Sequence, residues 1–469
     1  MLEPPVLRHL ERQVGAAHLY TRPADLAAYA YDASGASGER RLPEAVIFPA
    51  STEEVSQIVQ VCAANHLPVV PRGAGTGYVA GAVAVHGGVI LNLSRMSRVV
   101  GIDAEADRLH AEAGAITAHV QRSADAAGRY YPVDPGAAST STIGGNVATN
   151  AAGPRALRYG STANFLVAAT VVIADGRIHH LGEGGEASSL LPLLNASEGT
   201  LAVITEVILR LLPAPAGRVT LAATFADLEH ACSAVALISD ARIVPAALEL
   251  LDAAALRAIA ETGIAVVPNA AAFLLVEVEG DNTDAQSDSV RATLEAAGAT
   301  TVRVAADRAE AGRLWALRKA VSAAVAKVIV GKVNEDVVVP RDRVNELLQH
   351  CQRIGDKHHV PVVTFGHLGD GNLHISFLID PRLPGERARG DAAATDLFEV
   401  VLQMGGSLSG EHGVGTAKLA YVERQLGSAG VALMRGIKAH YDPGGLLNPG
   451  VKIPGAALPT AAPETAGVH

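Results

Sequence analysis

Two histidines in the last third of the chain have the spacing of a metal-binding pair. His367 and His374 flank the dipeptide Asp370-Gly371, which favours a tight β-hairpin between two apolar runs. If Gly369 pairs with Asn372, His367 lies directly opposite His374, and opposed Cβ atoms are about 4.5–5.5 Å apart. Two imidazoles at that separation can bind one divalent ion. For this hairpin alone, a pair of stacked or solvated histidines is the competing interpretation.

A glycine-rich segment at 405–418 adds a carboxylate and a third imidazole. Glu411 and His412 are neighbours in it, and adjacent side chains of an extended loop point in opposite directions. Two histidines and one carboxylate leave coordination positions open, as in catalytic metal sites, and Zn, Mn and Fe all accept this ligand set. We therefore expect Glu411 to bind the metal ion while His412 faces another group, such as a substrate proton.

Three earlier segments combine glycine with small polar residues. In the first, 71–77 (PRGAGTG), alternating glycines let the backbone approach a ligand and direct N–H groups at an anion. It also matches the nicotinamide fingerprint from Gly75 on, but that fingerprint must open a helix, and residues 78–92 are β-like. The second, 134–153, is polar enough to wrap a flat cofactor, and the third, 197–205, is a polar turn that runs into a strand. Taken singly, the first segment is also compatible with a simple tight turn and the second with a loop of unknown purpose.

Alternating strands and helices must position these segments. A strand at 45–50, a helix capped by Ser51 and Glu54, and a strand at 67–70 form a βαβ unit. Residues 174–176 (ADG) indicate a hairpin, and 213–215 (PAP) mark a domain boundary. Two β-α-β-β-like rounds follow, which suggests ferredoxin-like halves. Their expected strands are 219–224, 245–251, 272–279, 300–305, 335–339, 361–368 and 373–379, and the expected helices are 226–239, 284–297, 341–356 and 391–404, with a last helix at 422–440.

The order of these motifs resembles a known flavoprotein superfamily. PRGxGTG, then PGA…TxGGNxAxNAxG, then GTLxxxT is similar to the FAD domain of the vanillyl-alcohol oxidase (PCMH-type) superfamily over most of residues 40–215. GHxGDGNxH and GxxxGEHGxG, with Asp442-Pro443 and the segment 447–452, resemble its flavin-dependent 2-hydroxyacid dehydrogenase branch. That branch includes D-lactate and D-2-hydroxyglutarate dehydrogenases and the FAD subunit of glycolate oxidase.

The resemblance implies an α+β fold with a definite order of parts. We expect a two-part PCMH-type FAD-binding domain over 1–215 and a ferredoxin-like cap, or substrate domain, with the metal site over 216–420. A C-terminal helical segment over 421–455 is expected to return to the FAD domain, and a tail over 456–469 is expected to be disordered.

The resemblance also implies a cofactor site. Residues 72–77 are expected to hold the pyrophosphate, and Ile204 to pack near the adenine. Relatives with a covalent flavin carry a linking His or Cys where this loop has Thr76 and Gly77, so we expect FAD to be bound noncovalently. The full predicted set is Pro71, Arg72, Gly73, Ala74, Gly75, Thr76, Gly77, Pro135, Gly136, Ser141, Thr142, Gly144, Gly145, Asn146, Thr149, Asn150, Gly153, Gly199, Ile204, Glu411 and Asn448.

Roles in catalysis follow from the same resemblance. His367, His374 and Glu411 are the implied metal ligands, and the implied substrate-contacting residues are Arg318, Lys332, Asn372 and His412. His412 is the implied general base. Arg318 is the implied clamp for the substrate carboxylate, and it stands in a segment that matches a helix start at Trp315. A solvated helix arginine is the alternative for Arg318. Lys332 lies one place away from a second basic residue of some relatives, so a second carboxylate site is not expected.

Composition limits the partners. The formal net charge of −10 argues against nucleic-acid binding, because phosphates repel an acidic surface. The three cysteines form no CxxC pair, so electrons are expected to leave to a quinone, an electron-transfer flavoprotein, a cytochrome, oxygen or a separate iron–sulfur subunit. The N-terminus lacks the features of a signal peptide and no apolar run is long enough to cross a bilayer, which favours a cytoplasmic protein. Peripheral membrane association and a homodimer are compatible with these features.

The sequence therefore predicts a FAD-dependent dehydrogenase. It would oxidise a small 2-hydroxy acid, such as D-lactate or glycolate, to the 2-oxo acid by metal-assisted deprotonation of the hydroxyl and hydride transfer to flavin N5. Two other classes remain open at this point: a metal-dependent hydrolase that uses the His/His/Glu set, and a redox-inert FAD-binding protein.

Overall fold

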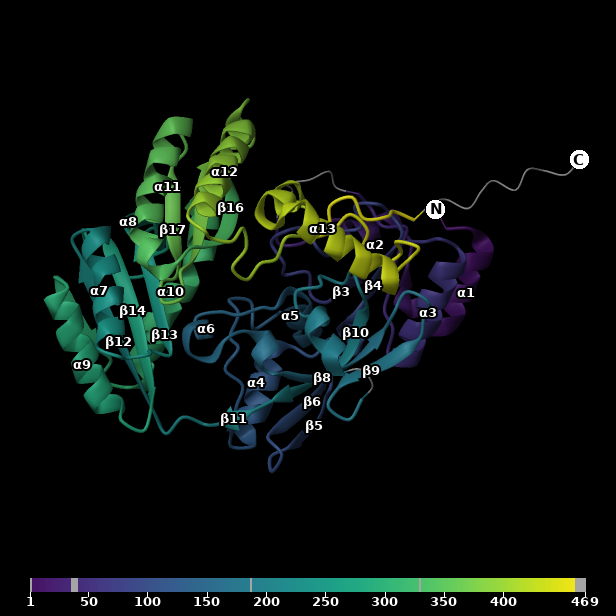
Figure 1. The fold of residues 1–469 in the computed structure, drawn as a ribbon, viewed down its shortest axis with the longest axis horizontal. Coiled ribbons are helices and arrows are strands. Elements are labelled where there is room, and N and C mark those ends of the chain that lie inside the picture. Colours follow the sequence, from purple (N-terminus) through teal and green to yellow (C-terminus); the bar gives the residue numbers. More distant parts are fainter. Residues whose placement is uncertain (1, 35–40, 186–187, 329, 460–469) are drawn as a thin grey trace, which may run out of the picture. The chain divides into compact units, whose positions relative to one another are not determined.

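The chain of the computed structural model divides into two compact units (Figure 1). Unit 1 comprises Met1–Ala152, Ser161–Ala214 and Glu411–His469, and unit 2 comprises Gly153–Gly160 and Pro215–Gly410. The structure describes residues 2–34, 41–185, 188–328 and 330–459. The tail predicted to be disordered, 456–469, thus lies outside the described residues from 460 on.

The first sheet of unit 1 is built around the predicted βαβ unit. Its strand order is β1-β2-β4-β3, in which β2, β4 and β3 run parallel. Ser51 caps α3 by accepting a hydrogen bond from the backbone N–H of Glu54, whose carboxylate accepts one from Ala50. On the other side of β3, Val69 forms a parallel bridge with Leu447, so the C-terminal segment extends this sheet.

The second sheet of unit 1 is antiparallel, in the order β5-β6-β10-β8-β9. The hairpin predicted at 174–176 joins β8 to β9. The strands of unit 1 are β1 (Leu19–Tyr20), β2 (Ala45–Ile47), β3 (Val69–Arg72), β4 (Val89–Asn92), β5 (Val99–Asp103), β6 (Arg108–Glu112), β7 (Arg129–Tyr130), β8 (Leu166–Val172), β9 (Ile178–Gly182), β10 (Val203–Arg210) and β11 (Leu212–Pro213). Its helices are α1 (Pro4–Val14), α2 (Pro23–Leu26), α3 (Thr52–Ala64), α4 (Thr117–Ala126), α5 (Ile143–Thr149) and α13 (Val422–Tyr441).

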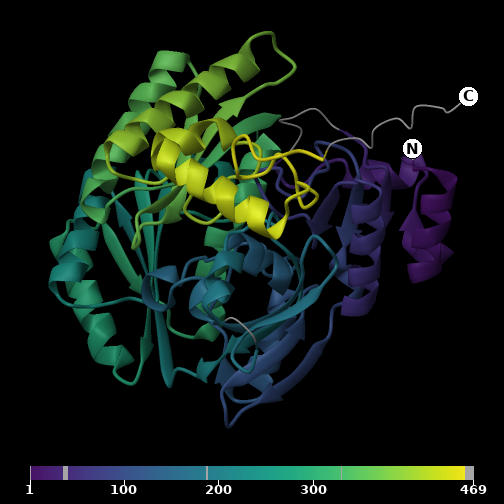
Figure 2. The same cartoon turned by 45° about the vertical axis from the view of Figure 1, so that its right-hand side comes forward.

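Unit 2 is built on one sheet of seven strands, in the order β15-β12-β14-β13-β17-β18-β16, seen from two directions in Figures 1 and 2. The strands are β12 (Gly217–Phe225), β13 (Ala247–Asp252), β14 (Ala272–Gly280), β15 (Thr301–Val304), β16 (Gly331–Val338), β17 (Val362–His367) and β18 (Asn372–Ile379). The helices are α6 (Ala156–Tyr159), α7 (Leu228–Asp240), α8 (Ala253–Ala260), α9 (Thr283–Ala296), α10 (Arg308–Val328), α11 (Val344–His358) and α12 (Glu386–Gln403).

Helices cover the two faces of this sheet differently. Leu251, Phe365 and Leu275 point to the face on which α8 and α10 pack. On the opposite face, Gly355 of α11 lies beside Val362, and α12 lies beside β16 and β18. The strands are therefore buried on both sides, which explains their nearly continuous apolar sequences.

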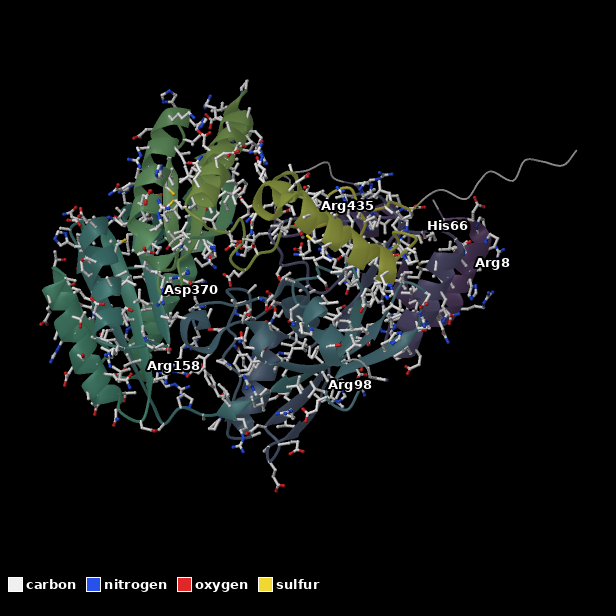
Figure 3. All side chains as sticks on the ribbon, in the orientation of Figure 1. Arg8, His66, Arg98, Arg158, Asp370 and Arg435 are labelled. Carbon is white, nitrogen blue, oxygen red and sulfur yellow. The ribbon has the colours of Figure 1, made fainter. Side chains whose placement is uncertain are left out.

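The predicted register of the histidine hairpin is wrong by two residues. His367 pairs with Asn372, and His374 pairs with Phe365. The turn occupies residues 368–371 instead of only two residues, with Gly371 at φ +81° and Asp370 (labelled in Figure 3) before it. A shift of two residues keeps every side chain on its face, so both histidines still point to the same side of the sheet.

Helix α10 also begins earlier than predicted. It starts at Arg308, so Trp315 lies inside the helix and does not begin it. Arg318 lies one turn after Trp315, on a long helix that packs on the sheet. Within the part of the chain that the structure describes, no helix is long and apolar enough to span a bilayer.

Candidate active site

Four polar side chains from different strands share one face of the unit 2 sheet. The register pairs Glu249 of β13 with His367 of β17, and His374 of β18 with Asp336 of β16. Paired residues of neighbouring strands point to the same side, so all four lie on the face that α8 and α10 cover. All four are buried, and buried ionisable groups need partners.

Glu249 joins His367 to Arg318. Its Oε1 accepts a hydrogen bond from Nδ1 of His367 at 2.7 Å, and its Oε2 accepts one from Nε of Arg318 at 2.6 Å. Burial alone would raise the pKa of Glu249, but the charges of His367 and Arg318 and the two hydrogen bonds outweigh it, so the pKa is lowered. Since an ionised carboxylate can only accept, Nδ1 of His367 is the donor in this hydrogen bond.

His374 lies beside His367 and Asp336. The two imidazole centroids are 5.3 Å apart with their planes at 85°, and Nδ1 of His374 is 3.8 Å from Oδ1 of Asp336. Asp336 also accepts hydrogen bonds from the backbone N–H of Gly410 and from Oγ of Ser409. Asp336 thus fixes the end of the segment that leads into Glu411.

Asn372 lies at the same end of the hairpin. Its Oδ1 is buried and has no hydrogen-bond partner among the described residues. A Cβ at Gly410 would lie 2.4 Å from this side chain, so only glycine fits there. An unpartnered amide oxygen at this position agrees with the prediction that Asn372 contacts a ligand.

Two basic side chains were predicted for the substrate. Arg318 is buried, with its guanidinium 5.2 Å from the centroid of the Phe365 ring. Lys332 lies on the edge strand β16, two positions before Asn334, and burial lowers its pKa. The alternative of a solvated helix arginine is wrong for Arg318.

The glycine-rich segments converge within unit 1. A Cβ at Gly73 would lie 2.1 Å from Oγ1 of Thr142, and a Cβ at Gly199 would lie 3.2 Å from Pro71 and 3.6 Å from Asn448. The loop at 71–77, the segment before α5 and the turn at 197–200 therefore meet, together with the C-terminal segment. Residues that belong to the predicted cofactor set line this meeting point.

The side chain of Arg72 does not project freely from its loop. Its guanidinium donates to the carbonyl oxygens of Ala82 and Tyr31 and lies 5.6 Å from the centroid of the Tyr29 ring. Those contacts hold the loop in shape. An anion at this loop would therefore be bound by backbone N–H groups, which three glycines leave accessible.

Several predicted cofactor side chains are engaged inside the loop at 134–153. Ser141 and Asn146 both hydrogen-bond Oγ1 of Thr117, and Oγ1 of Thr149 donates to the carbonyl of Gly145. Asn150 adopts φ +52° and accepts a hydrogen bond from Ala163. These contacts stiffen the segment, while the predicted contact of its residues with a cofactor stays a prediction.

Asn448 and Ser197 each have a buried polar atom without a hydrogen-bond partner among the described residues. Asn448 donates to the carbonyl oxygens of Gly81 and Glu198, whereas its Oδ1 is buried without a partner in the described residues, as is Oγ of Ser197. Orphaned buried acceptors and donors are rare in folded proteins and mark places where a ligand or water binds. A polar cofactor fits the residues present here.

The loop that carries Glu411 and His412 is fixed to the same loops of unit 1. The carboxylate of Glu198 accepts hydrogen bonds from the backbone N–H groups of Val414 and Gly415, at 2.9 and 2.7 Å. The rings of Tyr78 and His412 lie 4.7 Å apart with their planes at 33°. Burial, and then the charge of Glu411, raise the pKa of Tyr78.

Other predicted residues are distributed as follows. Pro135 and Gly136 lie in a turn in which Ala138 donates to the carbonyl of Pro135. Ile204 is buried at an irregularity in the pairing of β10 with β8. Gly153, at φ +111°, belongs to unit 2. Glu411 belongs to unit 1 and the two histidines to unit 2, so metal binding by the three together stays a prediction.

Sequence reasoning missed Glu249, Asp336 and Glu198 as site residues. Asp336 stands in a strand that also contains Lys332, Asn334 and Glu335, so nothing in the pattern singles it out. Glu249 stands in a strand that is mostly apolar, and an acid at such a position requires a buried partner. That signal was available. Glu198 carries no such signal, because its turn is polar throughout.

Comparisons with known proteins agree with this architecture. A family model described as FAD binding domain matches residues 43–182, and one described as FAD linked oxidases, C-terminal domain, matches residues 214–451. The chain belongs to the FAD-linked oxidases. It is 35% identical to the glycolate oxidase subunit GlcD of Bacillus subtilis (strain 168), over 90% of this chain and 91% of that protein. It is 35% identical to a D-lactate dehydrogenase of Anaerostipes hadrus, over 90% and 92%.

The fold of this FAD-linked oxidase is shared with a solved structure of p-cresol methylhydroxylase with substrate bound. The TM-score is 0.80 at 16% identity, covering 96% of both chains. The predicted α+β, PCMH-type fold is confirmed. Membership in the family makes the chain a FAD-binding oxidoreductase, and it supports neither the hydrolase nor the redox-inert interpretation.

Proposed function

We propose that this FAD-linked oxidase oxidises a small 2-hydroxy acid, of the class of D-lactate or glycolate, to the corresponding 2-oxo acid. Relatives that match almost the whole chain are named glycolate oxidase subunit and D-lactate dehydrogenase. Both names denote 2-hydroxy acids, which share a carboxylate next to a secondary or primary alcohol. A site for them needs a cation for the carboxylate and groups that act on the alcohol.

One observation carries the proposal: Arg318 and His367 are hydrogen-bonded to the same buried carboxylate, Glu249. This places a guanidinium, suited to a carboxylate, close to a pair of imidazoles. A 2-hydroxy acid carries its carboxylate and its hydroxyl on adjacent carbons, so it needs a cation and hydroxyl-binding groups close to one another. In this proposal Arg318 binds the substrate carboxylate.

The donor set also fits a divalent metal ion. His367 and His374 supply two imidazoles within one buried cluster, and Glu411 follows Gly410, which Asp336 holds. We propose His367, His374 and Glu411 as the ligands of a Zn, Mn or Fe ion. Such an ion, when bound, lowers the pKa of an oxygen ligand far below its ordinary value, as it does for bound water.

His412 is proposed as the general base. Its ring packs against Tyr78, and the backbone two and three residues later is fixed by Glu198, so the imidazole is held on an ordered loop. An imidazole accepts a proton near neutral pH. Asn372, with its unpartnered Oδ1, is proposed to accept a hydrogen bond from the substrate.

Noncovalently bound FAD would accept the hydride, and it is proposed to lie along the three glycine-rich segments of unit 1. The protein then has to pass electrons to a separate acceptor. The cysteines are Cys62, Cys232 and Cys351, and all three are free thiols far apart in sequence. We therefore propose an external acceptor, such as a quinone, an electron-transfer flavoprotein, a cytochrome or an iron–sulfur subunit.

Anaerobic reduction of the bound flavin tests this function. The purified yellow protein is mixed with a panel of small D- and L-2-hydroxy acids, and the flavin absorbance near 450 nm is followed. D-lactate or glycolate should bleach the flavin, and an equal concentration of acetate, which lacks the hydroxyl, should not. A protein that no 2-hydroxy acid bleaches would refute the proposal.

A further inference from the structure

Glu249 contacts two of the proposed ligand-binding side chains of unit 2. Its two oxygens are divided between His367, at 2.7 Å, and Arg318, at 2.6 Å, and its side chain is 1% exposed. None of the sequence motifs contains it. The function proposed above uses the metal ligands and the base, but it does not assign a role to this carboxylate.

We propose that Glu249 is a positioning residue that fixes the tautomer of His367 and the orientation of Arg318 together; this inference rests on the proposed function. With its hydrogen on Nδ1, the imidazole of His367 has its lone pair on Nε2, the nitrogen that would bind a metal ion. Carboxylates in this position orient metal-binding histidines, and their loss typically weakens metal binding by about 10- to 100-fold.

The same carboxylate aims the guanidinium. Glu249 accepts a hydrogen bond from Nε of Arg318. The guanidinium carbon of Arg318 lies 5.2 Å from the centroid of the Phe365 ring. In the described residues, no recorded hydrogen bond uses the two terminal nitrogens of Arg318. A guanidinium held through Nε presents those two nitrogens as a fork, which is the geometry that binds a carboxylate in two places.

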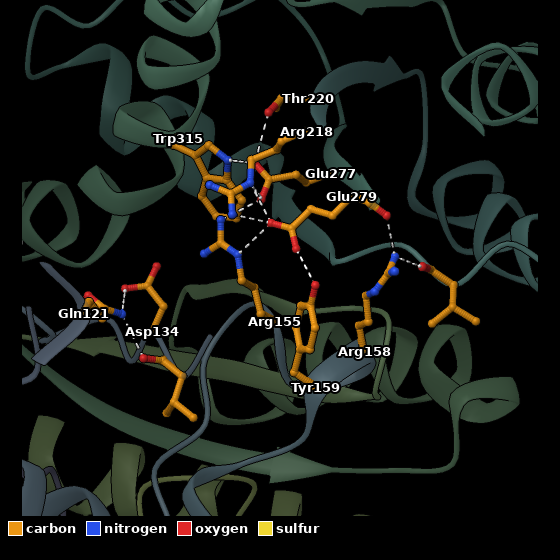
Figure 4. A network of polar contacts seen from close by, with 12 residues as sticks. Gln121, Asp134, Arg155, Arg158, Tyr159, Arg218, Thr220, Glu277, Glu279 and Trp315 are labelled. Atoms are coloured by element: carbon orange, nitrogen blue, oxygen red, sulfur yellow. Dashed lines mark hydrogen bonds and ion pairs between the residues drawn. The ribbon is translucent and has the colours of Figure 1, made fainter. Parts of the chain in front are cut away.

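A neighbouring group of acids provides a matched control (Figure 4). Glu277 of β14 points to the same sheet face as Glu249 and is equally buried. Its Oε1 pairs with Arg155 at 2.6 Å, and its Oε2 accepts a hydrogen bond from Nε1 of Trp315 at 2.7 Å. Its carboxylate also accepts a hydrogen bond from Oγ1 of Thr220 at 3.1 Å and lies 3.6 Å from Nε of Arg218. Glu277 is therefore a buried acid with arginine partners, and among the described residues none of its partners is a histidine.

The discriminating variant is Glu249→Gln. A glutamine side chain offers one acceptor oxygen, and its NH₂ group would face an N–H donor, so only one of the two hydrogen bonds can remain. Replacing Glu277 by glutamine likewise leaves one acceptor oxygen in place of two. A purely structural role predicts that both variants lower the melting temperature and do nothing else.

Zinc titration of the metal-stripped, FAD-bound protein separates the two roles. Glu249→Gln should raise the dissociation constant for Zn²⁺ by about 10- to 100-fold and raise KM for D-lactate more than it lowers kcat. Glu277→Gln should change neither by more than about 2-fold. Wild-type zinc affinity and KM in Glu249→Gln would overturn the proposal.

A second measurement needs no metal ion and no variant of Glu249. In wild-type protein with ¹⁵N-labelled histidine, the ring of His367, assigned by comparison with His367→Asn, should show the hydrogen on Nδ1. A hydrogen on Nε2 would overturn the proposal. If wild-type protein neither binds Zn²⁺ nor is bleached by any hydroxy acid, the proposed function fails, while this measurement still decides the role of Glu249.

Discussion

His367 and His374 lie diagonally across β17 and β18, with ring centroids 5.3 Å apart and ring planes at 85°. This arrangement brings the rings close without stacking them. Both backbones belong to a sheet that is buried on both faces, so the two side chains have few alternative orientations. The packing of the sheet thus holds the two rings in place.

Replacing His374 by alanine should remove bound metal without removing FAD. The predicted cofactor segments belong to unit 1 except for Gly153, whereas His374 is in unit 2. Elemental analysis and flavin absorbance of the purified variant measure the two quantities. His110→Ala is the control, because His110 is partly exposed and pairs with Glu206 within the antiparallel sheet of unit 1. Unchanged metal content in His374→Ala would contradict the assignment.

Replacing Glu198 by glutamine should loosen the loop that carries His412. The carboxylate accepts from both Val414 and Gly415, and glutamine can accept only with one oxygen. One buried N–H then lacks an acceptor, which costs about 1–3 kcal/mol. Urea unfolding should show this loss, and flavin reduction by substrate should slow. Glu206→Gln is the control, and equal stability of the two variants would argue against the role.

Replacing Lys438 by methionine should be among the most destabilising changes in unit 1. Lys438 is buried, pairs with Asp442, and donates to the carbonyl oxygens of Thr200 and Leu447. Burial lowers its pKa, while Asp442 opposes that shift. Removing one partner of a buried pair costs about 3–5 kcal/mol. Urea unfolding should show that the double variant Lys438→Met, Asp442→Leu recovers part of the lost free energy of unfolding. A double variant that loses more unfolding free energy than the two single variants together would exclude this account.

The stability of the fold should increase in mild acid through Asp252. Burial raises the pKa of this carboxyl group to about 6 from its ordinary 3.8, although it accepts hydrogen bonds from Ala255 and Thr364. The folded state binds the proton more tightly than the unfolded state, so the ionised group destabilises the fold above pH 6. That cost is relieved as the pH falls through 6, by about 2 kcal/mol at about pH 4.5.

Comparison with Asp252→Asn isolates this effect. Asparagine does not titrate, so the unfolding free energy of the wild type relative to the variant should rise between about pH 7 and about pH 4.5. A difference that stays constant, or falls, would show that Asp252 is ionised normally in the folded state.

The sequence predicted the cofactor segments and the histidine pair, because glycine spacing and turn dipeptides are local signals. The register of the hairpin could not be predicted in the same way, since Asp370-Gly371 is compatible with a two- or a four-residue turn. In the structure Gly371 also accepts a hydrogen bond from the backbone N–H of Val339, which lies outside the hairpin. The error spanned two residues, so it left both histidines on the same face of the sheet.

Glu249 and the inward side chain of Arg72 illustrate what local patterns omit. Glu249 becomes important only when β13 and β17 pair and α10 brings Arg318 to it, and these contacts join residues 69 and 118 positions apart. Arg72 follows the same rule, since its partners Ala82 and Tyr31 come from separate loops. Burial of charged groups is decided by tertiary pairing, which composition does not encode.

Stopped-flow reduction of the bound flavin by D-lactate, without oxygen, in wild-type protein and in His412→Ala tests the central claim most directly. Removing a general base typically lowers the rate by about 10²- to 10⁴-fold. We predict a loss of that size in the variant, with its FAD content unchanged. Flavin reduction at the wild-type rate in His412→Ala would contradict the account.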